Sequence, residues 1–186
     1  MSGNRRFADF YEGALPFQMS AIPEGGMCLS VFLVIWKEDI HHALLGKVNK
    51  EYDWVEVGAL SNETASRITQ RWMLPSSHLL LYESPKDASK RVLKEQLGLD
   101  TQTLEGPFVF SEVYDAPKYE IKNHWDMEFV FTGKVQSGND IRHPAWSELK
   151  FLDVRKIQDN ESVDQVLNLW ITHGYLIEIC KIDTES

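Results

Sequence analysis

The chain has 186 residues, of which 43% are hydrophobic and 25% are charged, a composition that excludes a disordered chain and is typical of a globular protein. Its formal net charge of −9 argues against broad non-specific binding to DNA, although a local basic patch can still bind phosphate. The two cysteines, Cys28 and Cys180, form no C-x-x-C pair, which disfavours a disulfide framework and fits a reducing cytoplasm.

Two segments near the start of the chain bear on targeting and on the fold. Residues 1–17 lack the long apolar core of a secretory signal. The most apolar run, residues 27–36, is too short to span a bilayer, so we expect no membrane association and a cytoplasmic location. This run contains strand-forming residues without polar alternation, which predicts a buried central strand. A charged turn at residues 37–39 follows it.

Residues 51–71 make a longer connection than is usual between strands. Residues 52–57 can extend a strand, and residues 61–71 can form a short helix that Ser61 or Asn62 caps. We interpret this segment as an insertion near the mouth of a binding pocket, because loops on a rigid scaffold often carry specificity.

Residues 72–99 predict a strand, a loop and a helix. Ser84 is followed by Pro85 and, three residues on, by Asp87, which together form a helix start signal. Gly98 stands where the end of a helix needs a residue in the left-handed conformation. One face of the predicted helix is apolar, which indicates packing against a sheet. This face consists of Ala88, Val92, Leu93 and Leu97.

The same stretch resembles the Nudix box, a pattern written G-x5-E-x7-R-E-U-x-E-E-x-G-U and usually preceded by W-x-L-P-G-G. Ser76 and Ser77 replace the glycine pair of the lead-in. Val92 replaces the first glutamate of the box helix, and Gln96 replaces the second glutamate of the E-E pair. The positions that match are Trp72, Leu74, Pro75, Glu83, Arg91, Leu93, Glu95, Gly98 and Leu99.

The resemblance implies an α/β fold, a Nudix-like α/β/α sandwich with a mixed β-sheet between helices. Residues 41–48 resemble the second strand of that sheet. It covers roughly residues 27–157 of what we expect to be a single domain over residues 1–186. Members of this family hydrolyse nucleoside diphosphates linked to another moiety, with Mg²⁺ or Mn²⁺. By the same resemblance, Glu83, Arg91 and Gly98 are structural residues of the box, and the first two tie its loop to its helix.

The metal ligands that the resemblance implies lie at positions 92, 95 and 96, one helical turn apart. Glu95 is the only carboxylate among them, and Gln96 offers a neutral oxygen. Mg²⁺ is usually held by carboxylates together with phosphate oxygens and water, so the loss of two charges leads us to expect no bound cofactor. If the chain is a hydrolase, Mg²⁺ or Mn²⁺ would bind at Glu95 and Gln96, and Glu95 would be a candidate catalytic residue.

The predicted box helix also carries Lys86, Lys90 and Lys94 at intervals of four residues. The simpler interpretation of this lysine stripe is a solvated helix face. The alternative is that the stripe binds the phosphates of a nucleotide or nucleic acid in a salt-sensitive manner.

Residues 108–115 predict a strand, and residues 124–135 predict another with strict alternation. On the second strand His124, Asp126 and Glu128 share one face. An imidazole and two carboxylates on one face can bind a metal or a ribose hydroxyl, which makes them candidate ligand-binding residues. A half-exposed strand with a solvated polar face is the interpretation that we favour.

Residues 137–143 predict a polar turn, and residues 146–157 resemble the late Nudix segment in which a glutamate precedes an aromatic strand. Glu148 matches that glutamate. In some members of the family an acidic residue in this region supplies a metal ligand or a base, so the resemblance makes Glu148 a second candidate catalytic residue.

The C-terminal part predicts an amphipathic helix over residues 162–174. Ser162 and Gln165 form a capping-box pair, and Gly174 is a plausible stop. Residues 175–182 are apolar again, and we expect them to pair with a strand of the same chain or to form a dimer edge, which makes a homodimer possible. The apolar stripe of the helix consists of Val163, Val166, Leu167, Trp170 and Ile171.

Three functions fit these observations. The first is a non-catalytic Nudix-fold module that binds a nucleotide, an RNA end or a protein. The second is a metal-dependent Nudix hydrolase with a rearranged site, which draws on Glu95, Glu148 and one of the strand carboxylates, Asp126 or Glu128. The third is a structural subunit of a larger complex. The missing ligands favour the first and the third over the second.

Overall fold

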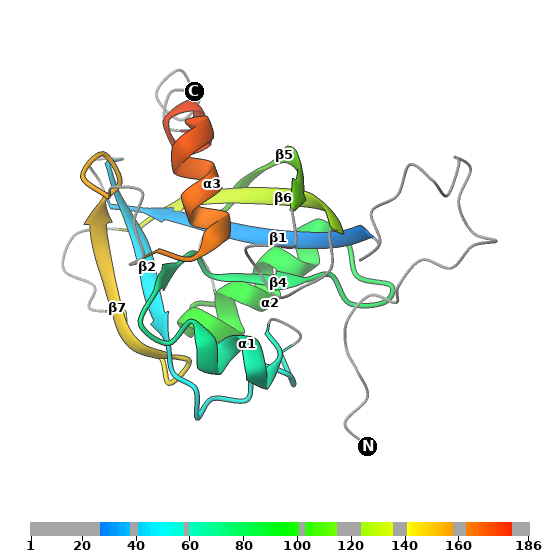
Figure 1. The fold of residues 1–186 in the computed structure, drawn as a ribbon. Helices are drawn as coiled ribbons and strands as arrows, with labels where there is room; N and C mark the ends of the chain where they lie inside the picture. Colours follow the sequence, from blue (N-terminus) through cyan, green and yellow to red (C-terminus); the bar gives the residue numbers. More distant parts are fainter. Residues whose placement is uncertain are drawn as a thin grey trace.

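The computed structural model describes residues 27–37, 41–57, 60–100, 103–114, 124–135, 141–157 and 163–179. In this part of the chain one seven-stranded sheet lies between helices (Figure 1). Its strands are β1 (Met27–Trp36), β2 (His42–Val48), β3 (Trp72–Met73), β4 (Ser76–His78), β5 (Glu105–Tyr114), β6 (His124–Lys134) and β7 (Trp146–Asp153). The helices are α1 (Asn62–Arg67), α2 (Pro85–Leu97) and α3 (Gln165–His173).

Strand β1 is the centre of the sheet, as its apolar sequence predicts. The strand order is β3-β2-β1-β6-β5, with β4 also paired to β1 and β7 also paired to β2. Strands β1 and β6 are parallel, whereas the other pairs are antiparallel, so the sheet is mixed. Every side chain from Val31 to Trp36 is at most 5% exposed, because both faces of β1 are covered.

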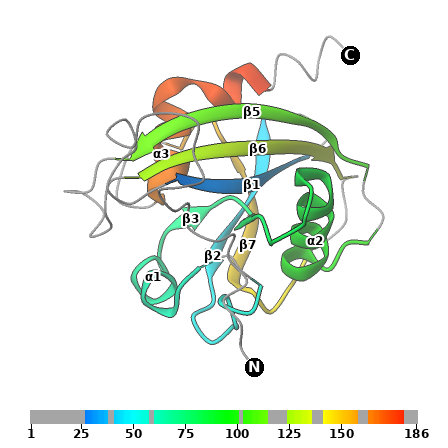
Figure 2. The ribbon, with the colours of Figure 1, turned by 90° about the vertical axis from the view of Figure 1, so that its right-hand side faces the viewer.

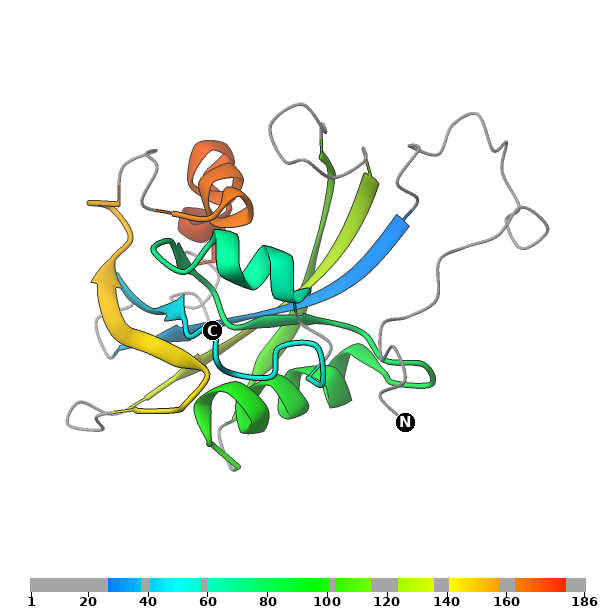
Figure 3. The same cartoon turned by 60° about the horizontal axis from the view of Figure 1, so that its bottom comes forward.

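Helices α2 and α3 cover opposite faces of the sheet, as Figures 2 and 3 show. Alternate residues of β1 point to the two sides. Val31, Leu33 and Ile35 pack with the apolar face of α2, whose members include Ala88 and Val92. The residues of β1 that pack with α3 are Phe32, Val34 and Trp36. The predicted α/β/α sandwich with a mixed sheet is confirmed.

Helix α2 begins and ends where its sequence predicts. The Ser84 side chain accepts a hydrogen bond from the Asp87 N–H, and Pro85 occupies the first turn. Gly98 is left-handed, with φ of 67°, and its N–H donates to the carbonyls of Leu93 and Lys94. Helix α1 is likewise capped by Ser61, as expected.

Residues 52–57, expected as a strand, form turns instead. Side chains hold these turns: the Asn49 Oδ1 accepts from the Glu51 N–H, the Trp54 Nε1 donates to the Asn49 carbonyl, and the Tyr52 hydroxyl donates to the Glu95 carbonyl. Such local bonds from side chains to the backbone compete with strand pairing.

The C-terminal prediction also needs correction. The N-cap of α3 is Asp164, whose carboxylate accepts from the Leu167 N–H, and Ser162 lies outside the described residues. Gly174 ends α3 in a left-handed conformation with φ of 75°, as predicted. Residues 175–179 are helical rather than extended, and residues 180–182 are outside the description, as is most of the predicted turn at 137–143. No helix among the described residues has the length and apolar character needed to cross a membrane.

Candidate functional site

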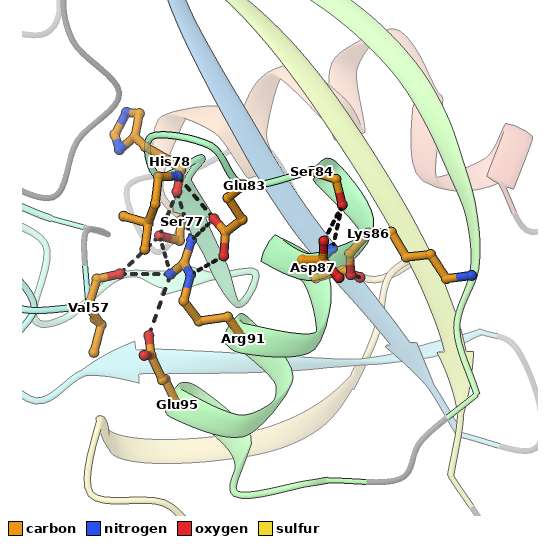
Figure 4. Close-up of polar contacts among 11 residues, drawn as sticks. Val57, Ser77, His78, Glu83, Ser84, Lys86, Asp87, Arg91 and Glu95 are labelled. Atoms are coloured by element: carbon orange, nitrogen blue, oxygen red, sulfur yellow. Dashed lines mark hydrogen bonds and ion pairs between the residues drawn. The ribbon is translucent and has the colours of Figure 1, made fainter.

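Arg91 and Glu83 fasten the loop before α2 to the helix, as the resemblance implies. The Arg91 Nε donates to Glu83 Oε1 at 2.7 Å, and its Nη2 donates to Glu83 Oε2 at 2.8 Å (Figure 4). Glu83 Oε2 also accepts from the Leu80 N–H at 3.0 Å. This bidentate pair fixes the loop in one geometry.

The remaining donors of Arg91 bind three further groups. Its Nη1 donates to the Val57 carbonyl at 3.0 Å and to Ser77 Oγ at 3.1 Å, and its Nη2 donates to the His78 carbonyl at 2.9 Å. Burial opposes the charge on Arg91, but the carboxylates of Glu83 and Glu95 outweigh this effect and raise the pKa of Arg91. One guanidinium therefore joins the box helix to the 51–57 turns, to β4 and to the loop.

Val92, at the position of the first box glutamate, is part of the core. Its side chain is 0% exposed and packs among the residues between α2 and the sheet. Position 92 therefore does not share a solvent-facing surface with Glu95, and the valine is there for packing.

Gln96, at the position of the last box glutamate, is also fully buried. Its Oε1 accepts from the Ser76 N–H at 3.1 Å, and its Nε2 donates to the Ser76 carbonyl at 2.6 Å. The amide thus binds both backbone groups of one loop residue. A glutamate could not make both bonds when ionised, because it has no donor.

Glu95 is the one box carboxylate that reaches the surface. Its side chain is 27% exposed, and Oε2 lies 3.4 Å from the Arg91 Nη1. Its backbone carbonyl accepts the hydroxyl of Tyr52 at 2.7 Å. Burial, then the charge of Glu95, raises the pKa of Tyr52, so the phenol stays a donor at neutral pH.

Glu148 lies on β7 and faces lysines. It is 3.1 Å from the Lys47 Nζ on the neighbouring strand β2, and it also contacts the Lys150 Nζ. Lys150 first, and Lys47 second, lower the pKa of Glu148. Its charge is therefore already balanced by two cations.

The donors present at the box do not fit a magnesium ion. The side chain of Val92 has no oxygen to offer a metal. Both polar atoms of the Gln96 side chain are hydrogen-bonded to Ser76, and the Glu95 carboxylate lies beside the Arg91 guanidinium. No group of three His, Cys, Asp or Glu side chains in the described ranges is placed to hold a metal. Mg²⁺ needs several oxygen ligands in near-octahedral geometry, which this constellation lacks.

The polar face of β6 is buried, so the expectation of a solvated face is wrong. Asp126 is 5% exposed, and the Ser30 hydroxyl lies 2.9 and 3.0 Å from its two carboxylate oxygens, to which it donates. Glu128 is 0% exposed and accepts from the Trp170 Nε1 at 2.7 Å. Burial raises the pKa of Asp126 to about 6. For His124 only the backbone is described, paired with Tyr114.

A third carboxylate joins this face and was not singled out from the sequence. Glu112 on β5 accepts the Tyr175 hydroxyl at 2.5 Å and lies 2.8 Å from the His173 Nδ1. The bond to Glu112 raises the pKa of Tyr175 to about 12. With Asp126 and Glu128 it forms an acid cluster beneath α3. Glu112 and Glu128 fasten the helix to the sheet, whereas the described contact of Asp126 is with Ser30 of β1. No local signal marks Glu112, because its partners lie more than sixty residues away.

The lysine stripe of α2 faces solvent. Lys86, Lys90 and Lys94 are exposed, whereas the neighbouring residues Ala88, Val92 and Leu93 are buried. Lys94 lies 3.4 Å from Asp100, whereas Lys86 and Lys90 form no ion pair with any residue in the described segments. Among the described residues, these two lysines thus present positive charge without an ion pair on an acidic protein.

Tyr82, in the loop before α2, is 97% exposed and has φ of 65°, an unusual conformation for a residue with a side chain. The Glu83 N–H donates to the Leu80 carbonyl at 3.1 Å, which closes a turn around Tyr82. No sequence signal marks this turn, since glycine or asparagine is the usual residue at such a position.

No family model and no curated protein matches the sequence. Solved structures do match. A dihydroneopterin triphosphate pyrophosphohydrolase from E. coli superposes with a TM-score of 0.57 and 13% identity, over 84% of this chain and 98% of that one. A MutT protein from Methanosarcina mazei Go1 superposes with a TM-score of 0.56 and 17% identity, over 86% of this chain and 96% of that one.

A NUDIX-family hydrolase from Clostridium perfringens gives a TM-score of 0.51 and 16% identity, over 81% of this chain and 97% of that one. Identities this low establish the fold and leave the activity open. The arrangement of sheet, box loop and box helix, together with these similarities, shows that the chain has the Nudix fold.

Proposed function

We propose that this chain is a non-catalytic binding module built on the Nudix fold. The observation that carries the proposal is the pair of bonds between the Gln96 amide and the backbone of Ser76. In a working box this position is expected to carry a charged metal ligand. Here a neutral amide ties the helix to the loop, so the loop holds its place without an ion.

The neighbouring positions support the same conclusion. Val92 is in the core, and the charge of Glu95 is partly balanced by Arg91. A single carboxylate would bind Mg²⁺ weakly and would add little stabilisation to a phosphate-rich transition state. A module that binds a ligand without turning it over requires neither a bound Mg²⁺ nor stabilisation of a transition state.

The ligand that the surface favours is a nucleotide or an RNA end. Lys86 and Lys90 are exposed without ion pairs in the described part of the chain, and Lys94 extends the stripe. Lysines bind phosphates as point charges, and such contacts weaken with salt. The net charge of −9 would oppose loose binding elsewhere on the surface, so the affinity should depend on this stripe.

The test is a titration with short RNA and with nucleotides at low and physiological salt. We expect binding that weakens with salt and is lost in Lys86→Glu/Lys90→Glu/Lys94→Glu. The matched control is Lys37→Glu/Lys50→Glu/Lys156→Glu, which makes the same charge change at exposed lysines outside α2 and should keep most of the binding. Equal binding by both triple variants, or none by wild type at low salt, contradicts the nucleotide proposal and favours a protein partner or a structural subunit.

A second candidate is a hydrolase with a rearranged metal site. The observation in its favour is that Glu95 remains partly exposed on a fold whose neighbours include hydrolases. Glu148 would be the other carboxylate. A screen of ADP-ribose, a dinucleoside polyphosphate and nucleoside triphosphates with Mg²⁺ and Mn²⁺ separates the candidates. We expect little or no turnover; turnover at ordinary enzyme rates that Glu95→Gln abolishes would establish the hydrolase instead.

A further inference from the structure

Strand β5 ends the sheet on the side away from β2. In the described part of the chain it pairs with β6 and with no other strand, so one row of its backbone N–H and C=O groups faces outward (Figure 2). Water can satisfy such groups, but so can another strand, and an unpaired edge is a template for pairing.

The two ends of β5 differ in how well they can pair. The register with β6 shifts between Glu105 and Phe108, and the intervening Pro107 has no N–H to donate. From Phe108 to Tyr114 the ladder with β6 runs without interruption. This seven-residue stretch, FVFSEVY, is rich in strand-forming residues and has a regular edge to offer.

The regular stretch lacks the outward charges that natural edge strands use against association. Its one charged residue, Glu112, turns beneath α3, where it contacts His173 and Tyr175 and is only 13% exposed. On the other face Val109 is 55% exposed and Ser111 is exposed. On a chain of net charge −9, this is a place where two copies can meet without opposing carboxylates.

A second exposed apolar residue lies in the segment that follows α3, which contacts β5 through Tyr175. Tyr175 stacks on Phe110 of β5, with ring centroids 4.4 Å apart. Two residues further on, Ile177 is 53% exposed in the helical segment 175–179. Large apolar side chains are thus exposed on β5 and beside it, Val109 on one face of the sheet and Ile177 on the other.

We propose that two copies of this chain pair through β5, antiparallel about a twofold axis, so that their sheets join into one. Antiparallel pairing of identical strands is isologous, so a single edge supplies both halves of the interface. The tail at residues 175–182, expected to pair with a strand of the same chain or to offer a dimer edge, is helical over 175–179. Strand β7 is a second described edge with a long ladder, but it carries the charges of Glu148 and Lys150, so β5 is the less charged of the two edges. The proposal concerns a surface apart from the lysine stripe and does not depend on ligand binding.

One short strand on each side buries less area than a standard interface, so we expect a reversible dimer whose population rises with concentration. Sedimentation velocity on the full chain over a range of concentrations measures this. Hydrogen exchange of the amides of residues 108–114 at low and high concentration locates the interface, because only outward amides of a paired edge gain protection on association.

The test variant is Val109→Lys, which replaces an exposed apolar side chain of each edge by a charge and should weaken the dimer at least tenfold, equivalent to about 1.4 kcal/mol. The matched control is Val55→Lys, at another exposed valine, 38% exposed, in the 51–57 turns, which should dimerise like the wild type. Both positions are exposed, and thermal unfolding of each variant verifies folding.

A chain that stays monomeric at the highest soluble concentration overturns the proposal. So does a dimer that Val109→Lys leaves intact, or one whose formation does not protect the amides of residues 108–114. The proposal is established if the dimer dissociates in the Val109→Lys variant and persists in the Val55→Lys variant, and if the amides protected from exchange on dimerisation are confined to β5.

Discussion

The two faces of the sheet carry buried polar networks of opposite character. On the α2 side, Arg91 is paired with Glu83, and the guanidinium of Arg91 donates each of its hydrogen bonds to an oxygen. Beneath α3, Asp126 and Glu128 are held by the neutral donors of Ser30 and Trp170. The first network sets a cation against carboxylates, whereas the second includes bonds from neutral hydroxyl and indole groups to carboxylates. The two networks should therefore respond differently to mutation and to pH.

The largest expected effect comes from breaking the network of Arg91. Arg91→Ala removes the cation from Glu83, whose side chain is only 12% exposed, and takes a donor from four further acceptors. Removal of one partner of a buried pair typically lowers the free energy of unfolding by about 3–5 kcal/mol. Urea unfolding measures this.

Two further variants sharpen the result. Arg91→Lys keeps the charge but loses the bidentate geometry, so we expect an intermediate loss. Lys90→Ala, on the exposed face of the same helix, should change stability by about 0.5 kcal/mol or less. A loss in Arg91→Ala no larger than that in Lys90→Ala would mean that the network is not what holds the loop.

The acid cluster beneath α3 should instead make stability depend on pH. Burial raises the pKa of Asp126 from 3.8 to about 6. The folded state therefore holds its proton more tightly than the unfolded state, so the free energy of unfolding is greatest below about pH 4 for this group and falls as pH rises through 6. Complete loss of this contribution amounts to about 3 kcal/mol.

Asp126→Asn removes this titration and should reduce the pH dependence of unfolding between about pH 4 and 6, with a gain in stability at neutral pH. The slope that remains is expected from Asp164, whose pKa burial raises to about 7. Urea unfolding across that window measures it. Asp100→Asn, at a residue whose side chain is 68% exposed, is the control and should leave the slope unchanged. An unaltered slope in Asp126→Asn would place the pH dependence in other groups.

The same contrast explains what could be predicted from the sequence. The caps of α2 at Ser84 and Gly98 are local signals and could be placed from the sequence, whereas the contact of Glu83 with Arg91 was implied by the resemblance to the Nudix box. The burial of Asp126 could not be predicted, because period-two alternation separates the faces of β6 without saying which one α3 covers.

The candidate site shows the same limit. The missing carboxylate at position 92 is visible in the sequence, and the apolar stripe predicts its packing. The bonds of Gln96 to Ser76 are not visible, since they join residues twenty apart through a loop of irregular geometry. Local sequence patterns therefore predicted the helix α2 correctly, but they did not predict the contact of Gln96 with Ser76 that holds the preceding loop against it.

The next prediction concerns that contact. Gln96→Glu loses the donor to the Ser76 carbonyl and buries a carboxyl group, which should lower the free energy of unfolding by about 2 kcal/mol at neutral pH. We expect millimolar Mg²⁺ not to restore the loss, because Val92 supplies no second carboxylate. Thermal melts with and without the ion decide this. A recovery with Mg²⁺ would show that position 96 can hold a metal and would revive the hydrolase candidate.

The smallest expected effect is a gain in stability at Tyr82. A residue with a Cβ in the left-handed conformation costs about 1–2 kcal/mol relative to the right-handed one, and Tyr82 has φ of 65°. Glycine relieves this strain but loses about 0.5–1 kcal/mol more conformational entropy on folding, so Tyr82→Gly should be more stable by up to about 1 kcal/mol. Because the side chain is 97% exposed, its removal sacrifices little buried area. Tyr82→Ala, which keeps the strain and deletes the ring, should be nearly neutral in urea unfolding. A loss of stability in both variants would instead mean that the tyrosine ring stabilises the turn at residues 80–83, in addition to the ion pair of Glu83 with Arg91.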